Sequence, residues 1–117
     1  MSEVQCLHIL RKHAGSRRPS SWRQETITQS KDDAIAQITA FRVELAKCSP
    51  QDLRAQFSAI AERESDCSSA RNGGDLGMFA RGQMQKSFED ASFALAVGEM
   101  SGLVDSDSGI HIILRVA

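Results

Sequence analysis

The chain has an apolar segment near each end, and each of these segments contains a histidine. Residues 4–10 and residues 109–116 alternate in the way that β-strands do. Both faces of the first segment are mostly apolar, which is typical of a central strand, and His8 shares a face with Cys6. A single histidine in such a strand is usually a core residue. Two strands side by side would bring His8 and His111 to one face of a sheet, which favours a functional role.

A cationic segment follows the first predicted strand. Residues 11–23 carry five of the 14 Lys and Arg residues and no Asp or Glu, although the net charge of the chain is only −1. Nucleic-acid binding through bulk charge is therefore excluded, and a local anion site is indicated. Arg17 and Arg18 are candidates for bidentate phosphate binding, Lys12 adds a point charge, and Trp22 is expected to hold this loop against the body. The alternative is a solvated basic loop.

Two start signals predict two helices after the basic segment. Ser30 and Asp33 form a capping box, which predicts a helix that continues to about Lys47. Ser49 followed by Pro50 is a second start signal with proline at the first helical position. Both helices have an apolar stripe, so they are expected to cover the core and not to form a ligand site.

The last part of the chain is predicted to contain one more helix and a hairpin. A short helix is expected over residues 87–95, with Ser87 as its N-cap and Gly98 stopping it. A short strand at residues 103–104 and a turn at residues 105–109 would then lead into the final strand.

Residues 65–84 combine one cysteine, Cys67, with hydroxyl groups, glycines and apolar side chains. This composition indicates either a shaped pocket or a buried glycine-rich connection. Cys6, Cys48 and Cys67 have neither the pairing of a disulfide framework nor the spacing of a zinc site. We therefore expect no metal, and reduced thiols in the cytoplasm or nucleus. A signal peptide and a membrane span are not indicated.

Several short motifs together carry a family resemblance: Gly73–Gly77, Arg81–Met84, Gly98–Glu99, Gly109–Ile113, Ser16–Arg23 and Ser65–Ala70. With these motifs the sequence resembles the parvulin family of peptidyl-prolyl cis/trans isomerases over nearly its whole length. The basic loop and the segment around Cys67 resemble the branch that is specific for phosphoSer/phosphoThr-Pro. The chain starts at the first strand of that domain, so it is similar to stand-alone forms without a WW domain, with residues 1–117 as one domain.

The resemblance implies an α+β fold, in which four helices surround a four-stranded antiparallel sheet in the order β-α-α-α-β-α-β-β. The helix near residues 68–71 and the strand near residues 76–79 are expected from the resemblance alone. Three departures concern local packing and the substrate loop. Ser87 stands where proline is common, Glu64 stands where an aromatic residue is usual, and residues 48–52 form an unusually long connection.

The resemblance also implies the site residues. Leu76, Met84 and Phe88 are expected to form an apolar pocket for the proline ring, and Gln85 to bind the substrate backbone. A polar floor for the rotating bond is expected from the catalytic residues Cys67, His8, His111 and Ser108, with Asp66 and Ser69 close by. Non-covalent stabilisation of the twisted amide is favoured over attack by the Cys67 thiolate, because a free thiol needs activation. No cofactor is expected.

Three other functions are compatible with parts of this pattern. A thiol peptidase or redox enzyme would use Cys67 with a histidine, but no C-x-x-C motif supports it. A phosphopeptide-binding module without catalysis would share the pocket and the basic loop. In a folding isomerase that does not require phosphate, Arg17 and Arg18 would have no phosphate to bind. The expected partners are phosphorylated Ser/Thr-Pro proteins, without nucleic acid or membrane, and the chain is expected to be monomeric.

Overall fold

The computed structural model describes residues 2–117 and contains one four-stranded sheet, three α-helices and one short 3-10 helix, η1. The order of elements is the one that the resemblance implied, and the expected fourth helix is η1. In chain order the elements are β1 (Glu3–Arg11), α1 (Lys31–Leu45), α2 (Pro50–Glu64), η1 (Ser68–Asn72), β2 (Asp75–Ala80), α3 (Lys86–Ala94), β3 (Val104–Ser106) and β4 (Gly109–Arg115).

The two apolar segments near the chain ends are the two central strands of this sheet. The strand order is β2-β1-β4-β3, and every neighbouring pair is antiparallel. In the register of β1 with β4, His8 lies opposite Ile113 and Leu10 lies opposite His111. Residues two apart on a strand point to the same face. The register therefore puts His8 and His111 on one face, as the alternation predicted.

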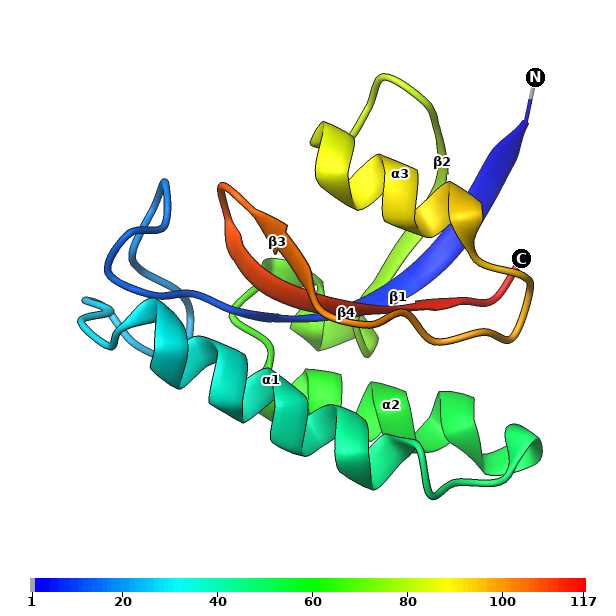
Figure 1. Ribbon diagram of the computed structural model, residues 1–117, viewed down its shortest axis with the longest axis horizontal. Coiled ribbons are helices and arrows are strands. Elements are labelled where there is room, and N and C mark those ends of the chain that lie inside the picture. Colours follow the sequence, from blue (N-terminus) through cyan, green and yellow to red (C-terminus); the bar gives the residue numbers. More distant parts are fainter. Residues whose placement is uncertain (1) are drawn as a thin grey trace.

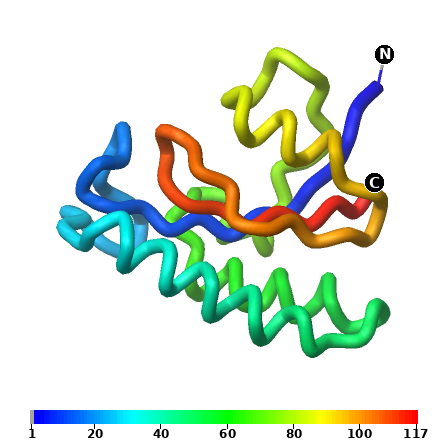
Figure 2. The backbone as a smooth tube through the Cα atoms, viewed as in Figure 1, coloured from blue at the N-terminus to red at the C-terminus, as the bar shows by residue number. Residues whose placement is uncertain are grey.

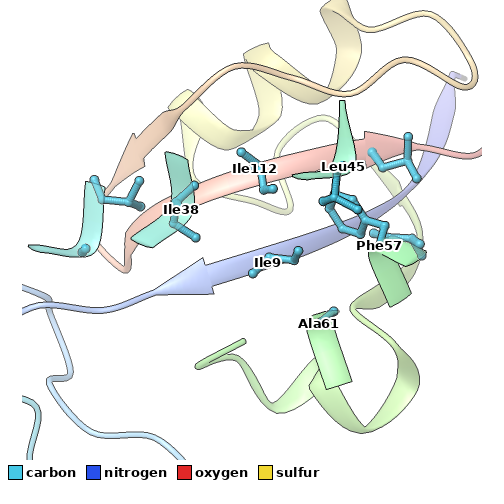
Figure 3. Packing of buried hydrophobic residues seen from close by; sticks show 10 residues of the cluster. Ile9, Ile38, Leu45, Phe57, Ala61 and Ile112 are labelled. Atoms are coloured by element: carbon cyan, nitrogen blue, oxygen red, sulfur yellow. The ribbon is translucent and has the colours of Figure 1, made fainter. Parts of the chain in front are cut away.

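The two faces of the sheet are covered by different helices (Figure 1). Helices α1 and α2 cover one face, where fully buried Ile9, Ile38, Phe57 and Ile112 belong to one core cluster (Figure 3). Helix α3 covers the opposite face, over a second cluster that includes Phe88. The histidines belong to the α3 face, so the large core under α1 and α2 supports the sheet from behind.

Local signals for the first two helices act largely as predicted. The Ser30 hydroxyl accepts a hydrogen bond from the Asp33 N–H, which caps α1. Pro50 is the first residue of α2. An N–H at this position would have no acceptor within the helix, so proline loses no hydrogen bond there. The Ser49 side chain bonds to the Asp52 carboxylate, at 3.0 Å, and leaves the backbone N–H groups uncapped.

The predicted bounds of the last elements need correction. Helix α3 begins at Lys86 with Gln85 as its N-cap, so Ser87 lies inside the helix and does not cap it. The first helical bond, from the Glu89 N–H to the Gln85 carbonyl, places the start two residues earlier than the capping pattern did. The helix ends at Ala94, before Gly98. Pairing of β3 with β4 extends the strand to Ser106 and leaves a two-residue turn.

Candidate active site

The two histidines form a buried pair at the centre of the sheet. Their Nδ1 atoms are 3.0 Å apart, and their rings stack with centroids separated by 5.2 Å. Both side chains are almost entirely inaccessible to solvent. Only one of the two Nδ1 atoms can carry the hydrogen in this contact, so the protonation states of the two rings are linked.

A serine on β3 continues this hydrogen-bonded chain. Nε2 of His111 lies 2.6 Å from the Ser106 hydroxyl, which also accepts a bond from the Ser108 N–H. The expected residue, Ser108, lines the same cavity, but its hydroxyl accepts from Gln85 and does not contact His111. Ser106 was missed because the strand was predicted to end at residue 104. If the strand had been predicted to continue to residue 106, Ser106 would have been placed on the same face as Val104, which lies opposite His111.

His111 is held in its neutral form. Burial and then the charge of His8 lower its pKa well below the ordinary value. A neutral imidazole has one N–H, so His111 donates either to His8 or to Ser106 and accepts from the other. The ring nitrogen of His111 that carries the hydrogen decides whether Nδ1 of His8 donates or accepts in the pair. It thereby also decides which nitrogen of His8 carries a hydrogen beside the neighbouring cysteine.

Cys67 lies at the start of η1 and is poised as a thiolate. Burial raises its pKa, but the proximity and the charge of His8, together with bonds from Ser69, lower it to about 6. The Ser69 N–H donates to Sγ at 3.5 Å. Nε2 of His8 is buried and meets no partner of regular hydrogen-bond geometry in residues 2–117. The imidazole therefore acts on the thiol through proximity and charge.

We expect the alkylation of Cys67 by iodoacetamide to reach half of its limiting rate near pH 6. The thiolate is the reactive form, so the rate rises as pH increases through the pKa, which is about 8.5 for a free thiol. Mass spectrometry of the modified peptides separates Cys67 from Cys6 and Cys48. In a His8→Gln variant the midpoint should move upward, and a wild-type midpoint near 8.5 would contradict the assignment.

The predicted apolar pocket shares one cavity with the histidines and the cysteine. This cavity has a volume of about 260 Å³ and a floor that includes His8, Cys67 and His111. The ring of Phe88 meets both histidine rings edge to face, with centroids 5.3 and 5.0 Å away. The remaining lining residues are Leu76, Met84, Gln83, Gln85, Ser106 and Ser108. An apolar wall thus stands directly beside a polar floor.

Gln85 lies on the wall of this cavity, but its amide already has two partners. Its Nε2 donates to the Ser108 hydroxyl at 2.8 Å, and its Oε1 accepts from the Asp107 N–H at 2.8 Å. The side chain therefore joins the start of α3 to the β3–β4 turn. Binding of a substrate backbone by Gln85 would require exchange of one of these bonds.

The basic segment lies next to the β3–β4 turn (Figure 2), to which the Arg17 N–H is bonded through the Asp107 carbonyl at 2.8 Å. Lys12 Nζ donates to the Ser20 carbonyl inside the segment. The side chains of Arg17 and Arg18 are exposed and make no ion pair with any residue from 2 to 117. The backbone bond of Arg17 thus joins the basic segment to the turn that carries Ser108 of the cavity lining.

Of the two residues that were expected close to the polar floor, Ser69 contacts Cys67 through its N–H, whereas the Asp66 carboxylate bonds to the basic segment. Asp66 is buried and faces the basic segment, where it accepts bonds from the Lys12 N–H, the Ser21 hydroxyl and Arg23. The Ser69 hydroxyl is buried without a partner in the described part of the chain. Trp22 is tied down by a bond from its indole N–H to the Ser65 carbonyl, although 57% of the residue is exposed.

Comparison with known proteins identifies the family and the fold. The family model described as "Rotamase: PPIC-type PPIASE domain" matches residues 8–117. This chain therefore belongs to the PPIC-type, or parvulin-type, peptidyl-prolyl cis/trans isomerases.

Individual relatives agree with this assignment. The chain is 53% identical to the peptidyl-prolyl cis-trans isomerase Pin1 of Digitalis lanata, covering 97% of this chain and 95% of the relative. It is also 53% identical to the isomerase ESS1 of Saccharomyces cerevisiae, covering 97% of this chain and 65% of that protein. The structure of the isomerase ESS1 from Candida albicans has a TM-score of 0.84 and 41% identity, over 98% of this chain and 63% of the other. Thus the chain spans about two thirds of the two ESS1 proteins.

Two features are absent from the described residues. Between residues 2 and 117, no helix combines the length and the apolar character that crossing a bilayer requires. The same residues contain no cluster of three or more His, Cys, Asp and Glu side chains suited to a metal ion.

Proposed function

We propose that this chain isomerises phosphoSer-Pro and phosphoThr-Pro bonds in proteins, without a covalent intermediate. One juxtaposition carries the proposal. The Arg17 N–H is bonded to the turn that carries Ser108 of the cavity, and neither Arg17 nor Arg18 makes an ion pair with residues 2–117. The apolar wall of that cavity contains Leu76, Met84 and Phe88. A phosphate carries a charge of about −1.5 to −2 at pH 7 and pairs well with two guanidinium groups. The apolar wall suits a pyrrolidine ring.

Anchoring both groups leaves the amide between them as the only part that turns. Rotation must overcome a barrier of about 18–20 kcal/mol, because twisting removes the amide resonance. An isomerase must therefore bind the twisted amide more tightly than either planar form. Twisting also reduces the negative charge on the carbonyl oxygen. A thiolate at Cys67 disfavours the planar form, whose oxygen is more negative, and the histidine pair keeps that thiolate in place.

The proposed partners are proteins phosphorylated on serine or threonine before proline. A cysteine with a low pKa is easily oxidised, so a reducing compartment such as the cytoplasm or nucleus suits Cys67.

We further propose that residues 1–117 act as one monomeric domain. The continuous sheet, with a core on each face in residues 2–117, supports that proposal.

The Arg17→Ala/Arg18→Ala variant should lose the preference for phosphorylated substrate. Exchange NMR on paired Ser-Pro and phosphoSer-Pro peptides measures that preference directly. We expect the ratio of kcat/KM values to fall roughly 10- to 100-fold, because each charge-assisted bond contributes about 1.5–3 kcal/mol. Arg54→Ala/Arg63→Ala removes the same charge from exposed positions on α2 and should leave the ratio unchanged.

Each other outcome points to a different function. Equal exchange of both peptides by the wild-type protein would leave an isomerase that does not select phosphate. Shifted protein resonances without any exchange would indicate a binding module. An unchanged ratio in the double variant would show that the phosphate binds elsewhere.

A further inference from the structure

One carboxylate joins the two ends of the basic segment. Glu64 is the last residue of α2, and its Oε1 contacts Nη2 of Arg11 and lies 3.6 Å from Nη2 of Arg23. Arg11 ends β1, where the basic segment begins, and Arg23 closes the segment at its other end. The intervening residues, with Arg17 and Arg18, are therefore held as a closed loop.

A second carboxylate reinforces the same closure. Asp66 Oδ1 accepts from Arg23 Nη1 at 3.1 Å and from the Ser21 hydroxyl at 2.8 Å, and Oδ2 accepts from the Lys12 N–H at 2.9 Å. We call Arg11, Arg23, Glu64 and Asp66 the neck of the basic loop. Its two positive and two negative charges balance, so the five basic residues of this segment are not equivalent. The neck pairs two of them and leaves Arg17 and Arg18 for a ligand.

Loss of the Glu64 charge would leave like charges together at the neck. Arg11 is only 8% exposed, and its Nε has no hydrogen-bond partner among residues 2–117. Burial and then the charge of Arg23 lower the Arg11 pKa, whereas Glu64 and Asp66 raise it. A buried charge without its partner is strongly unfavourable. The expected response is that Arg11 and Arg23 move apart and the loop opens.

The neck also adjoins the turn that carries Cys67. Ser65, between the two carboxylates, accepts a bond from the Leu10 N–H through its hydroxyl and a bond from Trp22 through its carbonyl. The Asp66 N–H donates to the Leu10 carbonyl at 2.7 Å. These three contacts at Ser65 and Asp66 therefore hold the Cys67 side of the site when Glu64 alone is changed. A neutral Glu64 should disturb the basic loop more than the cysteine.

We propose that Glu64 is a positioning residue that closes the neck of the basic loop and thereby sets the preference for phosphorylated substrate. The proposal rests on the proposed function, because it assigns Arg17 and Arg18 to the substrate phosphate. Glu64 itself touches neither the substrate nor the reacting bond.

The test compares Glu64→Gln with Glu62→Gln. Glu62 is exposed on the same helix and makes no ion pair in the part of the chain described, so it controls for the lost charge. With Glu64→Gln we expect KM for the phosphoSer-Pro peptide to rise about tenfold, with kcat nearly unchanged. The kcat/KM value for the unphosphorylated peptide should change less than about twofold. Amide resonances of Arg17 and Arg18 should shift in Glu64→Gln alone.

Two results would overturn the proposal. One is an unchanged ratio between the peptides in Glu64→Gln, and the other is an equal loss on both peptides, which would indicate a purely structural role. If Glu64→Gln does not fold, Arg23→Gln replaces it, because this variant opens the neck and leaves the Arg11–Glu64 pair intact. A wild-type protein without phosphate preference would instead refute the proposed function, and with it this role of Glu64.

Discussion

Replacing Gly74 by alanine is expected to destabilise the protein by roughly 2–5 kcal/mol, from a strained backbone and a steric clash together. Gly74 has φ +83°, which side chains rarely adopt. A Cβ there would lie 2.5 Å from the His8 carbonyl oxygen and 3.0 Å from the Ala61 Cβ. Because the nearest of these atoms belongs to the backbone of β1, relief of the clash requires the strand to move. Urea denaturation measures the loss of stability.

The same substitution should also impair the site, because the moving strand carries His8. The His8 N–H donates to the Gly74 carbonyl at 3.0 Å, so the two residues are fixed to each other. Gly77→Ala is the matched control. Gly77 has φ +72°, yet a Cβ there meets no atom within 4 Å. It should cost only about 1–2 kcal/mol of backbone strain. Equal effects of the two substitutions would show that the contact with β1 is not the cause.

Replacing Phe88 by alanine is expected to remove both stability and activity. Phe88 is 4% exposed, packs against Phe79 and forms the wall beside both histidines. Large-to-small changes at buried aromatic residues cost about 3–5 kcal/mol. The variant also loses the apolar surface proposed to hold the proline ring. We expect kcat/KM per folded molecule to fall at least about 100-fold, which corresponds to ~2.7 kcal/mol of transition-state binding.

Phe57→Ala separates these two effects. Phe57 is a fully buried residue of α2, on the opposite face of the sheet, in the cluster of Figure 3. Its loss should cost a similar 3–5 kcal/mol, while the activity of the molecules that remain folded should change less than about twofold. Exchange NMR below the unfolding transition gives the activity, and urea denaturation gives the stability. Similar activity losses in both variants would refute the assignment of Phe88 to the pocket.

The elements that could be predicted from the sequence are those with local signals. Alternation in the terminal strands was sufficient to place His8 and His111 on one face. The Ser30 capping box and Pro50 correctly marked the starts of two helices. These signals arise from interactions within a few residues, which a single sequence displays directly.

The features that could not be predicted depend on contacts between residues that are far apart in the sequence. Gln85 is the N-cap of α3 and binds the β3–β4 turn, and neither role has a pattern that identifies it. Ser106 was missed because the extent of β3 depends on its pairing with β4. Glu64 was noticed only as a departure from the usual aromatic residue. Its contacts with Arg11 and Arg23 depend on how α2 ends against β1.

The pairing of β1 with β4 has a consequence for how the protein is made. His8 and His111 are separated by 103 residues in sequence, and they meet only when β4 inserts between β1 and β3. Such distant pairings form slowly, because a long chain must close before any contact compensates for the lost entropy. During synthesis on the ribosome, the first strand, α1 and α2 therefore emerge well before the histidine pair can exist. The site can therefore form only after β4 has left the exit tunnel.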